Sequence, residues 1–168
     1  MPESNMTSAH ALPEPMQPIV WGAEQLEQVL AIEQQAYSHP WTAGQFRDAL
    51  AAGYHPLALV QGDRVCAYLV AMRGVDEVHL LNIAVAPEHQ GRGLASRLLE
   101  ALCAWSRGLG AQWLWLEVRE SNLQALRVYE HLGFRRVGLR KDYYPAGRTH
   151  REAAVVMSLS LMARPTEP

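Results

Sequence analysis

Apolar and polar residues follow two periods along this chain, and the change from one to the other predicts its elements. Helical spacing places Leu26 and Val29 on one side of a helix over residues 23–36. A second helix is predicted to begin after Thr42, because Gln45 three residues later completes a capping box. Shorter apolar runs predict strands over residues 19–21, 57–61, 65–72, 78–85, 113–118, 134–139 and 153–159.

Two further helices alternate with strands in the second half of the chain. One covers residues 94–107 and ends at Gly108, and Ser121 with Gln124 forms a capping box for another that continues to Leu132. The order strand–helix–strand–helix–strand predicts parallel pairing, whereas strands joined by turns predict antiparallel pairing. We therefore expect an α/β fold with a mixed, mostly antiparallel central sheet and helices on both faces.

The two ends of the chain differ in composition from its middle. Residues 1–17 combine Pro13 and Pro15 with many polar side chains, a composition that predicts a disordered tail. Residues 163–168 are similar, so one domain is expected over residues 18–162. The 168-residue chain, 49% apolar and 19% charged, has the usual composition of a globular domain.

Composition excludes several classes of function. A formal net charge of −2 offers no electrostatic basis for direct nucleic-acid binding or for attachment to an anionic membrane. No apolar run approaches the ~20 residues of a membrane span, and the first residues lack the pattern of a secretory signal. Cys66 and Cys103 lie in apolar surroundings and predict buried, reduced thiols. We expect a cytoplasmic protein without a metal site, and its oligomeric state stays open.

The clearest candidate for chemistry is the pair Gly91 and Gly93, between a predicted strand and a predicted helix. Glycine adopts positive φ easily and lets a ligand approach the backbone closely. The first amides of the following helix have no intrahelical acceptor and carry the positive end of the helix dipole. This loop therefore predicts a pyrophosphate site. A connector without a ligand is the alternative.

Three phosphate ligands compete for this loop. A Walker loop is excluded, because no Lys-Ser or Lys-Thr follows the second glycine. A dinucleotide fingerprint comes closer, with Ser96 where a third Gly or Ala belongs and Glu117 about 20 residues further on. However, five residues, 86–90, separate the strand from Gly91, whereas that fingerprint needs a tight turn. Coenzyme A is the third ligand, and on spacing alone the dinucleotide remains a competitor.

Residues 82–87 (NIAVAP) and 90–95 (QGRGLA) resemble the acetyl-CoA-binding signature of the GNAT superfamily of N-acetyltransferases. That signature is Gln or Arg, two residues, Gly, one residue, then Gly or Ala. Further segments are similar to the superfamily and narrow the resemblance to its bacterial RimI branch: 114–122, 126–134 and 140–145. The resemblance covers residues 19–160 and implies the GNAT fold.

The resemblance implies that acetyl-CoA is the cosubstrate, and it indicates the residues that bind it. The strand segment Ile83, Ala84 and Val85 would offer backbone groups to the pantetheine arm. Asn122 would contact the cofactor beyond the thioester, although helix capping together with Ser121 is a compatible alternative. The pyrophosphate would be held by backbone amides of Gly91, Arg92, Gly93, Leu94, Ala95 and Ser96.

Two residues match the family's catalytic pair, Glu117 as general base and Tyr129 as general acid. Glu117 shares a strand face with Trp113 and Trp115, and this apolar setting predicts a carboxyl pKa above its reference value of ~4.3. A structural glutamate paired with Arg119 or another base is the alternative. A phenol, with a reference pKa of about 10, can donate a hydrogen bond to the departing thiolate and protonate it. The alternative for Tyr129 is a core tyrosine.

The RimI resemblance further implies that the partner is a small-subunit ribosomal protein, acetylated on the N-terminal alanine of the eighteenth such protein. An N-terminal amine, with a pKa near ~8, loses its proton more easily than lysine at about 10.4. Trp41 is predicted to line the substrate entrance or to anchor the early helices. Tyr143, Tyr144 and Pro145 are predicted to form a substrate-side loop or a structural turn. Small amines and lysine side chains remain alternative acceptors, and a non-catalytic acyl-CoA-binding module an alternative function.

Overall fold

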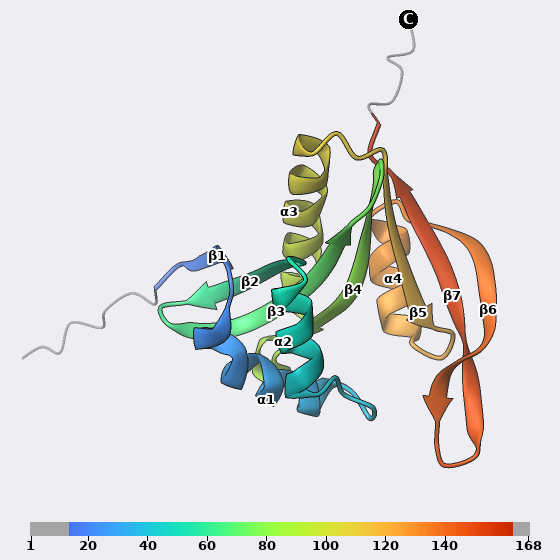
Figure 1. Ribbon diagram of the computed structural model, residues 1–168, viewed down its shortest axis with the longest axis horizontal. Coiled ribbons are helices and arrows are strands. Elements are labelled where there is room, and N and C mark those ends of the chain that lie inside the picture. The colour runs from blue at the N-terminus through green and yellow to red at the C-terminus, as the bar shows by residue number, and fades with distance from the viewer. Residues whose placement is uncertain (1–13, 163–168) are drawn as a thin grey trace, which may run out of the picture.

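Seven strands and four α-helices make up residues 14–162, the part of the chain that the computed structural model describes (Figure 1). The strands are β1 (Met16–Val20), β2 (His55–Gln61), β3 (Arg64–Arg73), β4 (Glu77–Val85), β5 (Trp113–Arg119), β6 (Arg135–Ala146) and β7 (His150–Ser160). The helices are α1 (Leu26–Ala36), α2 (Ala43–Ala51), α3 (Leu94–Gly108) and α4 (Leu123–His131), with single 3₁₀ turns η1 (Ala23–Gln25) and η2 (Pro87–His89). Most of the two predicted tails, residues 1–13 and 163–168, lies outside the described residues.

The strands form one sheet in the order β1-β2-β3-β4-β5-β7-β6. Every neighbouring pair is antiparallel except β4 and β5, which are parallel. The predicted mixed, mostly antiparallel sheet is thus confirmed. The predicted parallel pairing of β5 with β6, the strands before and after α4, was wrong. The two strands do run in the same direction, but β7 returns between them and pairs with both.

A separate hydrophobic core covers each face of the sheet. Helices α1 and α2 pack on one face around Trp21, Phe46 and Tyr68, whose rings meet edge to face. Helices α3 and α4 pack on the other face, where Leu98 and Leu126 are fully enclosed. Burial on both faces explains why β2 and β3 read as nearly continuous apolar runs, whereas buried and half-buried residues alternate along β4 and β5.

The feature of the sheet that creates a site is the separation of β4 from β5. These strands are paired only from Glu77 with Trp113 to Leu80 with Leu116. Directly afterwards, at Leu81, the register of β4 against β3 shifts by one residue. Because a bulge bends its strand and increases the local twist, β4 turns away from β5. In Figure 1 the two strands meet at the top and separate downwards, toward their C-terminal ends.

Short-range signals predicted several elements correctly. Thr42 caps α2, with its Oγ1 accepting from the Gln45 amide at 3.2 Å and its own amide donating to Gln45 Oε1 at 2.9 Å. The hairpin of β2 and β3 turns at Gly62, which has the positive φ that such a turn requires. Cys66 and Cys103 are both buried and free, as predicted.

Three boundary predictions were wrong. Strand β1 begins at Met16, so the predicted tail over residues 1–17 ends too late. Helix α4 is capped by Asn122, whose Oδ1 accepts from the Ala125 amide at 3.2 Å, and not by Ser121. Strands β6 and β7 extend well beyond the predicted 134–139 and 153–159, so Tyr143, Tyr144 and Pro145 lie within a strand and not in a loop.

No helix among residues 14–162 combines the length and the apolar character needed to cross a membrane.

Candidate active site

The glycine loop has the geometry of an anion site. Gly91 and Gly93 both have φ of +75°, a left-handed conformation that strongly favours glycine. Gly93 is the N-cap of α3, and its carbonyl accepts from the Arg97 amide at 3.1 Å, so the amides in between have no acceptor within the helix. A side chain built on either glycine would meet nothing within 4 Å. The space over the loop is therefore open to a ligand.

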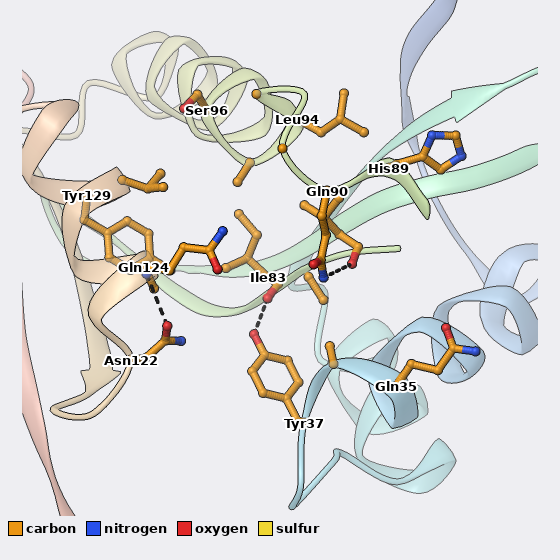
Figure 2. A pocket seen from close by; sticks show the side chains of 18 residues that line it. Gln35, Tyr37, Ile83, His89, Gln90, Leu94, Ser96, Asn122, Gln124 and Tyr129 are labelled. Atoms are coloured by element: carbon orange, nitrogen blue, oxygen red, sulfur yellow. Dashed lines mark hydrogen bonds between the residues drawn. The ribbon is translucent and has the colours of Figure 1, made fainter. Parts of the chain in front are cut away.

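A cavity of about 390 Å³ lies between this loop, β4 and α4 (Figure 2). Every residue predicted to bind the cofactor lines it except Arg92; these residues are Ile83, Ala84, Val85, Gly91, Gly93, Leu94, Ala95, Ser96 and Asn122. The lining runs from apolar residues of β4 and α4 to the glycine loop at the start of α3. Such a lining fits a pantetheine arm that leads to a pyrophosphate at the helix start.

The free edge of β4 presents its backbone to this cavity. In an antiparallel strand the N–H and C=O of one residue point to the same side. The Ala86 amide donates to the Cys66 carbonyl on β3 at 2.8 Å. The carbonyls of Ile83 and Val85 accept from Tyr37 Oη and from Gln90 Nε2 on the opposite side (Figure 2). The amides of Ile83 and Val85 therefore also point away from β3, into the gap between β4 and β5.

A second cavity, of about 570 Å³, adjoins the first. Its walls include Glu117 from β5, Trp41 from the α1–α2 loop, and Tyr144 and Pro145 from β6. Tyr129 lines both cavities, together with Ala36, Tyr37, Ile83 and Asn122. The two cavities thus meet at Tyr129, and the predicted catalytic pair lies at and beyond this junction.

Tyr129 combines a packed ring with a position at the junction of the two cavities. Its side chain is 7% exposed, and its ring packs against Phe134 with centroids 5.7 Å apart. Figure 2 shows the ring pointing from α4 toward the cavity. Burial raises the pKa of Tyr129 well above its usual value, so the phenol keeps its proton at any neutral pH. The core and active-site interpretations of this residue are both compatible with its position.

Glu117 is held by two basic side chains from other strands. Its Oε2 lies 2.5 Å from His79 Nε2 on β4, and its Oε1 lies 3.5 Å from an Arg140 guanidinium nitrogen on β6. Burial acts to raise the carboxyl pKa, but the hydrogen bond and charge of His79 and the charge of Arg140 outweigh it and lower the pKa overall. The prediction of a raised pKa was therefore wrong, because sequence spacing could not indicate these two partners.

Arg119, the partner considered for Glu117, lies elsewhere. It pairs with Glu152 at 3.2 Å, donates to the Pro145 carbonyl at 2.9 Å, and stacks over the Tyr144 ring at 4.6 Å. Burial first, then nearby Tyr143 and Glu117, raises the pKa of Tyr144. Arg119 thus fixes the β6–β7 hairpin against β5 and leaves Glu117 to face the second cavity.

Trp41 and Asn122 each combine the two interpretations that the sequence allowed. Trp41 lines the second cavity and also packs on Phe46, with centroids 5.1 Å apart. Asn122 caps α4 and lines both cavities. Each side chain therefore has a structural role and also lines the site.

Three residues of the site were not found from the sequence: Tyr37, His79 and Glu33. Glu33, on α1, is only 1% exposed and lines the second cavity. Its carboxylate accepts from the Trp41 amide at 2.9 Å, from Asn82 Nδ2 at 3.0 Å and from the Tyr68 hydroxyl. A glutamate within an otherwise apolar helix face was the available signal, since buried carboxylates are almost always paired.

Within residues 14–162, no three His, Cys, Asp or Glu side chains gather closely enough to hold a metal ion.

The comparisons with known proteins agree with this geometry. Residues 26–134 match the acetyltransferase (GNAT) family. The chain is 40% identical over 135 residues to the [ribosomal protein bS18]-alanine N-acetyltransferase of Haemophilus influenzae, covering 80% of this chain and 92% of that protein. It is 41% identical over 130 residues to the enzyme of the same name from Salmonella typhimurium, covering 77% and 87%.

Among solved structures, the chain resembles the ribosomal-protein-S18-alanine N-acetyltransferase from Escherichia coli. The TM-score is 0.82 at 34% sequence identity, over 92% of this chain and 99% of that one. These matches confirm the resemblance that the glycine loop and the later segments carry. The chain therefore belongs to the acetyltransferase (GNAT) family and is an acetyl-CoA-dependent N-acetyltransferase.

Proposed function

We propose that this enzyme acetylates the N-terminal alanine of ribosomal protein bS18, with Glu117 as general base and Tyr129 as general acid. The observation that carries this proposal is the meeting of two cavities at Tyr129, one lined by the anion-binding loop and the other by Glu117. Relatives named for this reaction are 40% and 41% identical over most of their own length. Both substrates would then be bound together, and the acetyl group would pass directly between them.

The first cavity would hold acetyl-CoA with its thioester at the junction. The amides of the loop and of the first turn of α3 would bind the pyrophosphate, which is where a helix dipole favours negative charge. The amides of Ile83 and Val85 point into the gap between the strands, as shown by the directions of their carbonyls. One of them would donate to the oxyanion that forms on the acetyl carbonyl.

The second cavity would hold the peptide N-terminus beside Glu117. Because its pKa is lowered, Glu117 is ionised at neutral pH and ready to accept a proton from the incoming ammonium, directly or through a water. The freed amine attacks the thioester carbon and the carbon–sulfur bond breaks. Tyr129 donates to the departing thiolate, since its phenol is protonated at neutral pH.

The proposal is tested with a peptide of the bS18 N-terminus, purified enzyme and acetyl-CoA, followed by mass spectrometry. Acetylation is expected on the free N-terminal alanine, and not on the same peptide with a blocked N-terminus and free lysines. Glu117→Gln and Tyr129→Phe are each expected to lower kcat by roughly 10²-fold or more, the usual contribution of a positioned acid or base. Acetyl-CoA affinity should change little. Transfer to lysine in place of the N-terminus would contradict the acceptor, and unchanged kcat in both variants would contradict the catalytic pair.

A further inference from the structure

The two cavities of the site are joined by a neck, formed by the residues that line both of them. These residues are Ala36, Tyr37, Ile83, Asn122 and Tyr129. The glycine loop lines only the first cavity, and Glu117 lines only the second. The neck therefore lies at the end of the first cavity that is away from the pyrophosphate site. In the proposed function, the acyl group at the end of the pantetheine arm occupies this neck.

Three elements supply the walls of the neck. Ile83 comes from β4, and Asn122 and Tyr129 come from the N-cap and the body of α4. The third wall is the C-terminal end of α1, where Ala36 contributes only a methyl group and Tyr37 a whole ring. In Figure 2, Tyr37 and Leu94, at the start of α3, lie on opposite sides of Ile83. Tyr37 is thus the large side chain at the far end of the cofactor cavity.

The chemistry of acyl transfer assigns the acyl chain to this α1 wall. The tetrahedral carbon carries four substituents: oxygen, sulfur, nitrogen and the acyl chain. In the proposed function the oxygen faces an amide of β4, the sulfur faces Tyr129 of α4, and the nitrogen comes from beside Glu117 of β5. The wall that remains for the fourth substituent is α1, with Tyr37.

Tyr37 is held in place at both ends of its side chain. Its backbone forms the C-cap of α1, where its amide donates to the Glu33 carbonyl at 3.1 Å. Its hydroxyl donates to the Ile83 carbonyl on the free edge of β4 (Figure 2). The ring between these two points is half-buried against the core that α1 and α2 cover. It cannot move aside for a longer acyl chain without losing the hydrogen bond to β4.

We infer that Tyr37 restricts the acyl donor to acetyl-CoA, because its ring lies where the additional carbons of a longer acyl chain would be. Tyr37 is then a specificity-determining residue that contacts the methyl group of the bound acetyl. An ammonium and a thioester give an amide, a thiol and a proton whatever the length of the acyl chain. The selection among acyl groups therefore comes from the fit of the chain at Tyr37. This inference rests on the proposed function, which puts the thioester between β4 and Tyr129.

The test measures kcat/KM for acetyl-CoA, propanoyl-CoA and butanoyl-CoA with one acceptor peptide. We expect the propanoyl-to-acetyl ratio to rise about tenfold or more in Tyr37→Ala, the size of effect that one methylene has in a closed pocket. Tyr37→Leu keeps more apolar contact with the core and should raise the ratio too, also if the alanine variant does not fold. Tyr37→Phe keeps the ring, so its ratio should lie closer to that of the parent than to that of Tyr37→Ala. Both donors are used on the same preparation, so the ratio does not depend on the fraction of enzyme that is folded.

Tyr54→Ala is the matched control, because Tyr54 packs against the same core as Tyr37 but lines neither cavity. Its propanoyl-to-acetyl ratio should equal that of the parent. A ratio within roughly twofold of the parent in both Tyr37→Ala and Tyr37→Leu would overturn the inference, since one methylene is worth more than that. An equal rise in Tyr54→Ala would also overturn it, because general loosening of the core would then explain the change. If the parent acetylates lysine in place of the N-terminus, the proposed acceptor fails instead, and the acyl ratio is measured with the lysine peptide.

Discussion

At the scale of single residues, the site depends on carboxylates whose partners come from distant strands. Glu117 is held from β4 and β6, and Glu33 from β3, β4 and the α1–α2 loop. Burying a carboxylate is costly unless nearby donors form hydrogen bonds to its oxygens. Glu33 therefore links the wall of the acceptor cavity to the strand that carries Ile83 and Val85.

Replacement of Glu33 by alanine is expected to destabilise the whole domain. The change leaves the Asn82 amide, the Tyr68 hydroxyl and the Trp41 amide without their acceptor, at about 1–3 kcal/mol for each buried orphan group. We expect the free energy of unfolding to fall by roughly 3 kcal/mol, measured by urea denaturation. Glu27→Ala, an exposed glutamate of the same helix, is the control. A difference between the two variants below about 0.5 kcal/mol would contradict this role, since surface substitutions lie within that range.

At the scale of elements, sequence reasoning succeeds where a signal is local and fails where the pairing of distant strands decides. The capping box of Thr42 with Gln45 and the turn at Gly62 are decided within a few residues, and both were predicted. Nearly every residue of β6 is exposed, so this strand carries no apolar run and its second half was not recognised as strand. The polar contact of His79 with Glu117 depends on the register of β4 against β5, which no local pattern specifies.

The same hairpin contains a bulge that directs side chains into the acceptor cavity. Between Arg140 and Tyr144 the register of β6 against β7 shifts, and Asp142 has φ of +52°. Arg151 of β7 holds this bulge, donating to the Asp142 carbonyl at 2.7 Å and to the Tyr143 carbonyl at 2.8 Å. The bulge explains how Arg140 reaches Glu117 while Tyr144 lines the cavity.

Loss of the Arg151 hydrogen bonds is expected to affect the acceptor and not the cofactor. Arg151→Met keeps much of the aliphatic stem but removes both donors, so the bulge loses two contacts of about 0.5–1.5 kcal/mol each. We expect the KM for the acceptor peptide to rise by several-fold, since 1.4 kcal/mol corresponds to a factor of ten. The KM for acetyl-CoA should stay near the parent value, because the first cavity is lined by α1, β4, α3, α4 and the loops next to them. Arg135→Met, an exposed arginine at the start of β6, is the control; equal effects on both KM values would contradict the assignment.

At the scale of the whole molecule, elements that pack on both faces of the sheet reach the gap between β4 and β5. The loop before α3 and the start of α4 approach the gap from one face of the sheet, and α1 approaches it from the other. A ligand in the first cavity would contact elements of both cores at once. Binding of acetyl-CoA is therefore expected to stabilise the fold globally, by about 2.7 kcal/mol at a hundred times its Kd.

Substitutions of the two glycines at the ends of α3 distinguish stabilisation by bound acetyl-CoA from the stability of the helix itself. Gly93 and Gly110 have φ of +75° and +77°, and a side chain on either would meet nothing within 4 Å. Alanine at either position is therefore strained by its backbone alone, at about 1–2 kcal/mol.

Without ligand, Gly93→Ala and Gly110→Ala should lower the Tm by similar amounts, measured by thermal unfolding. With saturating acetyl-CoA, the parent and Gly110→Ala should gain the same increase in Tm, and Gly93→Ala a much smaller one. Equal increases in all three proteins would mean that the loop before α3 does not hold the pyrophosphate, because Gly93 alone of the pair lies in the proposed site.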